Sequence, residues 1–309
     1  MWIERTLRDW VLFFLLIAVW GSTFSMMKLT VASIPPLTAV AIRMILGLAI
    51  LYPTMRLMGQ KLPSFFPKEQ SQQSSGPICW LYLTLVSLTG SIVPASLLMW
   101  GQVEIDTGLA GILIAFAPIT TLILAHIFLP EEKMTIPKIT GFVLGFIGIG
   151  VLMGPSALGR FGSDDTFIYQ FAVFCAAIIY GSNHVIAKKM PPLHPLAAGT
   201  GMVLIAAVIT TPVALIVDQP WTLQPTNLSL FMAFLLGVFP TGLAYVLFFT
   251  LINSAGPTFV ALSSYLVPIW AIMVGVFFLG ERPGLNVLAA LILILAGSGL
   301  SQLRSKTKT

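Results

Sequence analysis

The chain has 309 residues, of which 57% are hydrophobic and 9% are charged, and its formal net charge is +5. Soluble domains have roughly 45–50% apolar and about 25% charged residues, so a soluble fold could not cover this much apolar side chain with polar surface. The mean hydropathy of +0.95 therefore predicts an all-α polytopic membrane protein. Cys79 and Cys175 both lie in apolar runs and offer neither a zinc-ligand spacing nor a disulfide framework.

Ten segments are apolar enough to cross a hydrocarbon core, which takes about 20 residues. In chain order they are residues 10–28, 36–57, 78–100, 107–129, 136–154, 167–187, 194–217, 228–252, 257–279 and 285–303. Turn sequences such as SIPPL, KKMPPLHP and GERPG separate them, so most consecutive helices are expected to be antiparallel neighbours. The N-terminal segment shows no small-residue cleavage site, and we expect a retained first helix rather than a signal peptide.

The positive charges predict the orientation of this bundle. Ten crossings place both termini on one side of the membrane, and three-quarters of the 16 Lys and Arg residues fall on that side. These are Arg5, Arg8, Arg56, Lys61, Lys68, Lys133, Lys138, Lys188, Lys189, Arg304, Lys306 and Lys308, whereas Lys28, Arg160 and Arg282 fall on the opposite side. Because cytoplasmic loops attract Lys and Arg, both termini are expected in the cytoplasm. The same distribution explains the basic charge without a nucleic-acid partner.

The chain also repeats internally. At an offset of 160 residues, Trp20-Gly21-Ser22 matches Tyr180-Gly181-Ser182. At an offset of 150, residues 115–133 match residues 265–283, and the long loop between the second and third helices absorbs the change of offset.

Because five is an odd number of crossings, the second half would be inverted relative to the first, and inverted repeats are typical of secondary transporters. We therefore expect two five-helix repeats at residues 1–155 and 166–304, followed by a cytoplasmic tail at residues 305–309.

These features resemble the EamA branch of the drug/metabolite transporter superfamily. The resemblance rests on the aromatic-Gly-Ser near the end of the first helix, on a Pro-led second helix with an early Arg43, and on GLAGILIAFAPITTLILAHIFLPEEK with its echo in the second half. It covers nearly the whole chain. It implies ten helices, a central cavity lined mainly by helices one, three, four, six, eight and nine, and export of amino acids or related metabolites.

Polar and aromatic residues recur on one face of several helices and predict a chamber between them, since polar groups within a membrane face the bundle interior or water. The candidate substrate-binding residues are Trp20, Ser22, Thr23, Met99, Tyr180, Asn183, His184, Tyr245, Phe248, Phe249, Ser264, Tyr265 and Trp270. An aromatic wall with few hydrogen-bonding groups suits a small zwitterion with an apolar or aromatic side chain. The alternative for each polar residue is a hydrogen bond that joins neighbouring helices.

Asn183 and His184 occur only in the second half and are the first candidates for substrate specificity. His184 could carry a proton, because imidazole titrates near neutral pH, or could serve as a hydrogen-bonding wall. Carboxylates lie at helix ends or in loops, and only Glu104 and Asp106 come near a span. The first helix lacks the deep carboxylate that small multidrug exporters of the superfamily use for proton–cation exchange, which argues against that mechanism here.

Arg43 has two interpretations: it snorkels to the outer surface or has a structural partner, or it attracts a substrate carboxylate. Pro118 and Pro268 interrupt equivalent helices and are the expected hinges. Glycines at 141, 145 and 148 would allow close packing either within the chain or between two copies, so a monomer and a homodimer both stay open.

The sequence thus predicts an inner-membrane transporter that exports amino acids or related small metabolites by alternating access, with bulky apolar or aromatic side chains favoured. Its expected partners are a small-molecule substrate and the lipid bilayer, with no cofactor and no metal. The alternatives are a broad exporter of amphipathic drugs and a solute channel. An enzyme is the weakest alternative, because the sequence has no H-E-x-x-H, G-x-S-x-G or paired intramembrane Asp.

Overall fold

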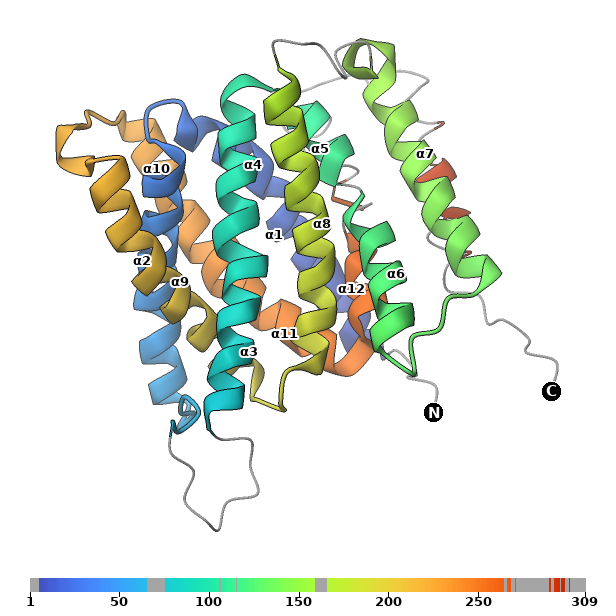
Figure 1. Cartoon of the computed structure of the whole chain (residues 1–309), viewed down its shortest axis with the longest axis horizontal. Helices are drawn as coiled ribbons and strands as arrows, with labels where there is room; N and C mark the ends of the chain where they lie inside the picture. The colour runs from blue at the N-terminus through green and yellow to red at the C-terminus, as the bar shows by residue number, and fades with distance from the viewer. Residues whose placement is uncertain are drawn as a thin grey trace.

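The computed structural model describes residues 6–65, 76–105, 107–114, 116–158 and 166–263, and beyond these residues 266–267, 270, 289, 292–294, 296–297 and 300. This part of the chain is a bundle of helices that run side by side, with α7 at its edge (Figure 1). Its helices are α1 (Leu7–Val31), α2 (Pro36–Leu57), α3 (Pro77–Ser87), η1 (Leu88–Ile92), α4 (Val93–Glu104), α5 (Thr107–Ile114), α6 (Ala117–Phe128), α7 (Ile136–Leu158), α8 (Phe167–Lys189), α9 (Pro195–Val217), η2 (Pro220–Thr222), α10 (Asn227–Leu236), η3 (Gly237–Leu243), α11 (Ala244–Ala255) and α12 (Pro257–Ala261).

Within the described residues, each of the first eight predicted crossings coincides with a helix or with a series of consecutive helices. The third crossing comprises α3, η1 and α4, the fourth comprises α5 and α6, and the eighth comprises α10, η3 and α11. The ninth begins at α12, and most residues of the ninth and tenth lie outside the described part. Among the described residues, six helices are long and apolar enough to cross a membrane: Leu7–Val31, Pro36–Leu57, Pro77–Glu104, Phe167–Lys189, Pro195–Val217 and Asn227–Ala255. The chain is therefore a multi-pass membrane protein.

Local sequence signals set where the helices begin. Pro36, Pro77 and Pro195 each occupy the first helical position. A backbone N–H at this position has no partner within the helix, so proline loses no hydrogen bond there. At the start of α1, the hydroxyl of Thr6 accepts a hydrogen bond from the Asp9 N–H at 3.2 Å, and the Asp9 carboxylate accepts one from the Thr6 N–H at 2.9 Å. This reciprocal capping box satisfies donors that a helix start leaves free.

Two of the long crossings contain a π-helical segment, η1 in the third and η3 in the eighth. The N–H of Val93 bonds the carbonyl of Leu88, and the N–H of Ala244 bonds that of Phe239, so both bonds span five residues. Such segments widen a helix by one residue and are frequent at functional sites. The 150-residue offset relates residues 88–92 to residues 238–242, so the two π-helical segments occupy equivalent places in the two halves of the sequence.

Two close contacts between helices also occupy equivalent places. A Cβ atom added at Gly21 would lie 2.7 Å from Cδ1 of Trp270, and one added at Gly181 would lie 2.6 Å from the Ala117 carbonyl oxygen and 2.6 Å from Cβ of Thr120. The two sequence offsets relate Gly21 to Gly181 and Thr120 to Trp270. Both glycines are therefore needed for the close approach of a neighbouring segment.

The glycines of α7 pack within the chain. A Cβ atom added at Gly297 would lie 2.5 Å from the Gly141 carbonyl oxygen and 2.8 Å from the Gly145 nitrogen, and one added at Gly148 would lie 2.7 Å from Cγ1 of Ile294. Of the two alternatives for this stripe, the intramolecular contact is the one observed.

Candidate substrate site

One group of buried polar side chains lies around η1 and η3. Arg43, Ser91, Asn183, Thr241 and Tyr245 are each at most 6% exposed, and Tyr180 beside them is half-buried. These six residues are called the central polar cluster. They come from α2, η1, α8, η3 and α11, so the cluster joins helices from both halves of the sequence.

On η3, Thr241 links the backbone to Arg43. Pro240 has no N–H, so it cannot bond the carbonyl of Leu236. The hydroxyl of Thr241 donates to that carbonyl at 2.9 Å and accepts a hydrogen bond from Nε of Arg43 at 3.0 Å. Gly47 permits this approach of α2 to η3, because a Cβ atom there would lie 2.6 Å from Cγ2 of Thr241.

On η1, Tyr245 performs a similar role from the opposite half. Pro94 cannot donate a hydrogen bond to the carbonyl of Gly90, and the Tyr245 hydroxyl lies 3.3 Å from that carbonyl oxygen. The same hydroxyl lies 2.5 Å from Oγ of Ser91. Ser91 and Thr241 are related by the 150-residue offset, so each π-helical segment contributes one hydroxyl to the central polar cluster.

Asn183 holds α8 against η1 and the end of α3. Its Nδ2 donates to the Val86 carbonyl at 3.0 Å and lies 3.0 Å from Oγ1 of Thr89. The contact requires Gly90, since a Cβ atom there would lie 2.7 Å from Nδ2 of Asn183. Both amide hydrogens of Asn183 therefore donate to groups on a neighbouring helix. A hydrogen bond of this kind is the alternative to substrate binding that the sequence analysis gave for each polar residue.

Only one ring nitrogen of His184 has a hydrogen-bond partner among the described residues. Nδ1 lies 2.7 Å from the Tyr180 carbonyl oxygen, and a carbonyl oxygen only accepts, so Nδ1 carries the proton and Nε2 of the neutral ring is an acceptor. The side chain is 5% exposed, and Nε2 is buried with no partner in the described part of the chain. The His184 ring lies edge-on to Phe248, with 5.5 Å between ring centroids.

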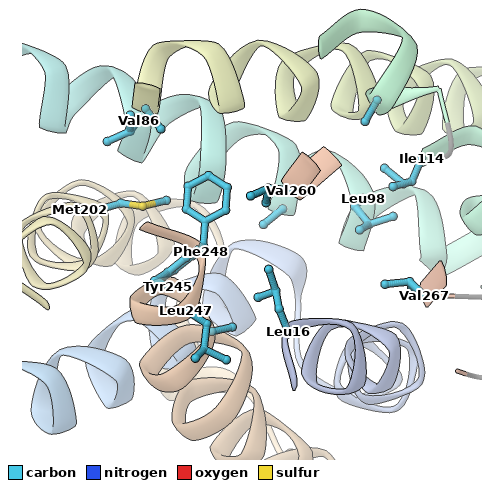
Figure 2. Close-up of a cluster of buried hydrophobic side chains, with 14 of the residues drawn as sticks. Leu16, Val86, Leu98, Ile114, Met202, Tyr245, Leu247, Phe248, Val260 and Val267 are labelled. Atoms are coloured by element: carbon cyan, nitrogen blue, oxygen red, sulfur yellow. The ribbon is translucent and has the colours of Figure 1, made fainter. Parts of the chain in front are cut away.

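The predicted aromatic wall is assembled in the structure around Phe248. Its ring centroid lies 6.0 Å from that of Trp20 and 5.2 Å from that of Phe249. Figure 2 shows the Phe248 ring pointing between Met202 and Val260, from the ribbon that also carries Tyr245. The aromatic side chains are therefore packed against the apolar interior in the described conformation.

Other predicted site residues have different surroundings. The hydroxyls of Ser22 and Thr23 donate to carbonyls one turn back in α1, each at 3.0 Å, and Met99 is fully buried in the apolar core. Trp270 packs on Gly21, and its Nε1 is buried with no partner in the described part of the chain.

Three predicted positions, Ser264, Tyr265 and the hinge Pro268, lie outside the described residues. Pro118 lies in the first turn of α6. The interruption of helix four and a hinge there stay predictions.

Sequence reasoning missed Ser91 and Thr241 and left the role of Arg43 open. Arg43 is 4% exposed and donates to Thr241. Of the two structural possibilities, snorkelling and a structural partner, the structure therefore shows the partner. The signal that could have revealed η3 is the proline followed by a hydroxyl in GVFPTGL, in the middle of an apolar run.

Side chains also tie the two ends of α1 to the crossing that contains η3. Ser254, near the end of α11, donates to the Asp9 carboxylate at 2.6 Å. Ser229, at the start of α10, donates to the carbonyl of Leu29 at 2.7 Å. These two bonds are called the end ties, and both are formed in this structure.

The fold and the buried polar cluster define a multi-pass membrane protein whose interior carries polar groups in an apolar bundle. A model of the EamA-like transporter family matches residues 8–154 and 167–302. The chain belongs to the EamA-like transporter family and is a membrane transporter.

Known proteins resemble this chain over much of its length. The uncharacterized transporter YoaV of Bacillus subtilis is 25% identical over 289 residues, which cover 90% of this chain and 91% of YoaV. A probable terminal-alkyne amino-acid exporter of Streptantibioticus cattleyicolor is 27% identical over 207 residues, which cover 65% of this chain and 66% of that protein. One crystal structure superposes with a TM-score of 0.76 at 17% identity, over 97% of this chain and 99% of the other, which shows the fold.

Proposed function

We propose that this transporter exports amino acids or related small metabolites with bulky apolar or aromatic side chains, by alternating access between the two sides of the inner membrane. The proposal includes ten crossings in two inverted five-helix repeats with both termini in the cytoplasm. The observation that carries it is the central polar cluster, where two π-helical segments at equivalent places each present a hydroxyl to the other half.

The chemistry beside this cluster supports the proposed substrate class. Nε2 of His184 is a buried acceptor without a partner among the described residues, and an amino group has the N–H donors to bond it. Phe248 lies next to His184 and Trp20 lies next to Phe248, and these rings would receive an apolar or aromatic side chain. The relative from Streptantibioticus cattleyicolor, a probable amino-acid exporter, supports an amino-acid substrate.

The end ties and family membership support alternating access. An inverted repeat moves between two conformations by exchanging the states of its halves. The Asp9–Ser254 tie and the Leu29–Ser229 tie lie at opposite ends of α1. If one of these two hydrogen bonds breaks while the other stays formed, the bundle would open on one side of the membrane at a time.

Counterflow in proteoliposomes tests the proposal. Vesicles loaded with unlabelled phenylalanine, leucine or glutamate would be diluted into trace labelled amino acid, with and without a pH gradient. We expect saturable accumulation that depends on internal phenylalanine or leucine and exceeds that with glutamate. Flux without saturation would indicate a channel, and uptake of lipophilic amines without any amino acid would indicate a drug exporter.

A further inference from the structure

Arg43 presents an electrostatic problem that its structural partner does not solve. Its side chain is 4% exposed within α2, a helix apolar enough to cross a membrane. A guanidinium stays protonated in proteins, and burying a charge without a counter-charge is costly. The single hydrogen bond from Nε goes to the neutral hydroxyl of Thr241, so this bond supplies no negative charge.

No carboxylate among the described residues bonds to Arg43. Asp9 accepts hydrogen bonds from Thr6 and Ser254, Asp218 from Thr38, and Glu132 from Lys138 and Thr258. Glu104 and Glu131 are exposed. The remaining acidic residues of the sequence lie in predicted loops and helix ends.

The guanidinium also has an open donor. Nη1 of Arg43 is buried and has no hydrogen-bond partner among the described residues, while Thr241 fixes the orientation of the guanidinium through Nε at 3.0 Å. A planar guanidinium held in this way matches the geometry of a carboxylate. Thr241, which holds the guanidinium, lies one helical turn before Tyr245, and Tyr245 contacts Ser91.

We propose that Arg43 is the anchor for the carboxylate of the transported substrate. Nη1 donates to a carboxylate oxygen while Nε stays on Thr241, and the ligand supplies the negative charge that the described protein groups lack. This assignment rests on the proposed function and deepens it, because it restricts the substrate to molecules with a carboxylate. Arg43 thereby serves as a specificity-determining residue.

The test compares ligands that differ only in this group. Binding of L-phenylalanine and of L-phenylalaninamide, which lacks the carboxylate, would be followed by tryptophan fluorescence of the purified protein in nanodiscs. We expect the wild type to prefer the acid by about 30-fold or more, as is typical when one partner of a buried charge pair is removed. Arg43→Gln should lose this preference, and Arg43→Lys should keep part of it. Arg56→Gln is the matched control, since Arg56 lies exposed at the end of the same helix.

An unchanged preference in Arg43→Gln, or equal binding of acid and amide by the wild type, would overturn the assignment. If Arg43→Gln does not give folded protein, Thr241→Val replaces it, because this variant keeps the charge but releases Nε. A reduced preference for the acid would then support the anchor, and an unchanged preference would overturn it. The two proposals fail separately: absence of amino-acid counterflow in the wild type defeats the proposed function, whereas counterflow together with an unchanged preference in Arg43→Gln defeats only the anchor.

Discussion

Replacing Gly181 by Ala tests the close contact between α8 and α6. The added Cβ atom would lie 2.6 Å from the backbone oxygen of Ala117 and 2.6 Å from Cβ of Thr120. Restoring an ordinary carbon contact of 3.5 Å requires a separation of about 0.9 Å. Neither atom is the end of a flexible side chain, so one helix must move. The hydrogen bond from the hydroxyl of Thr121 to the Gly181 carbonyl, now 3.0 Å, would be stretched by the same movement.

We expect Gly181→Ala to lower the free energy of unfolding by about 1–3 kcal/mol, the usual cost of overpacking. The gain of about 0.5–1 kcal/mol from Ala in a helix offsets only part of this. Gly150→Ala in α7 is the matched control, because no atom of the described residues lies within 4 Å of its added Cβ atom, and it should be neutral or stabilising.

The assay is reversible unfolding by SDS in mixed micelles, followed by tryptophan fluorescence. If Gly181→Ala is as stable as Gly150→Ala, the contact between α8 and α6 is not as tight as described, and the argument from equivalent glycines fails.

Three further predictions concern the interior. A double-mutant cycle of Tyr245→Phe and Ser91→Ala should give a coupling free energy of about 0.6–1.7 kcal/mol in the same unfolding assay, as for hydrogen bonds between other membrane helices; additive single effects would contradict the bond at 2.5 Å. Asn183→Ala should lower the free energy of unfolding by about 1 kcal/mol and slow counterflow, because it removes the donor to the Val86 carbonyl. A variant with wild-type stability and wild-type counterflow would argue against this role of Asn183. His184→Ala should raise the KM for phenylalanine counterflow while the protein stays folded, and an unchanged KM would remove His184 from the site.

The positions of the helices could be predicted because their signals are local. Apolar runs of membrane-spanning length give the crossings, and Pro36, Pro77 and Pro195 mark the starts of helices. The inward faces of α8 and α11 also followed from helical spacing, since Asn183, His184, Tyr245 and Phe248 are all buried.

The contacts inside the bundle could not be predicted in the same way. A π-helical segment adds one residue to a helical turn. In a run of apolar residues, the spacing of side chains at 3.6 residues per turn gives no sign of this extra residue. The bond between Arg43 and Thr241 joins residues 198 positions apart, and their separation depends on how closely Gly47 and Gly237 let α2 approach η3. The sequence therefore indicated a charged residue in the membrane, but its burial and its partner depend on packing.

The most direct test of alternating access is the accessibility of the two ends of the bundle. In a chain with Cys79→Ala and Cys175→Ala, single cysteines at Ser254 and at Thr226 would be labelled with a maleimide in proteoliposomes, with and without saturating phenylalanine. Ser254 belongs to one end tie, and Thr226 precedes α10 at the other. Alternating access predicts that the substrate changes the two labelling rates in opposite directions. Rates that rise together, or that do not respond to the substrate, would contradict the account.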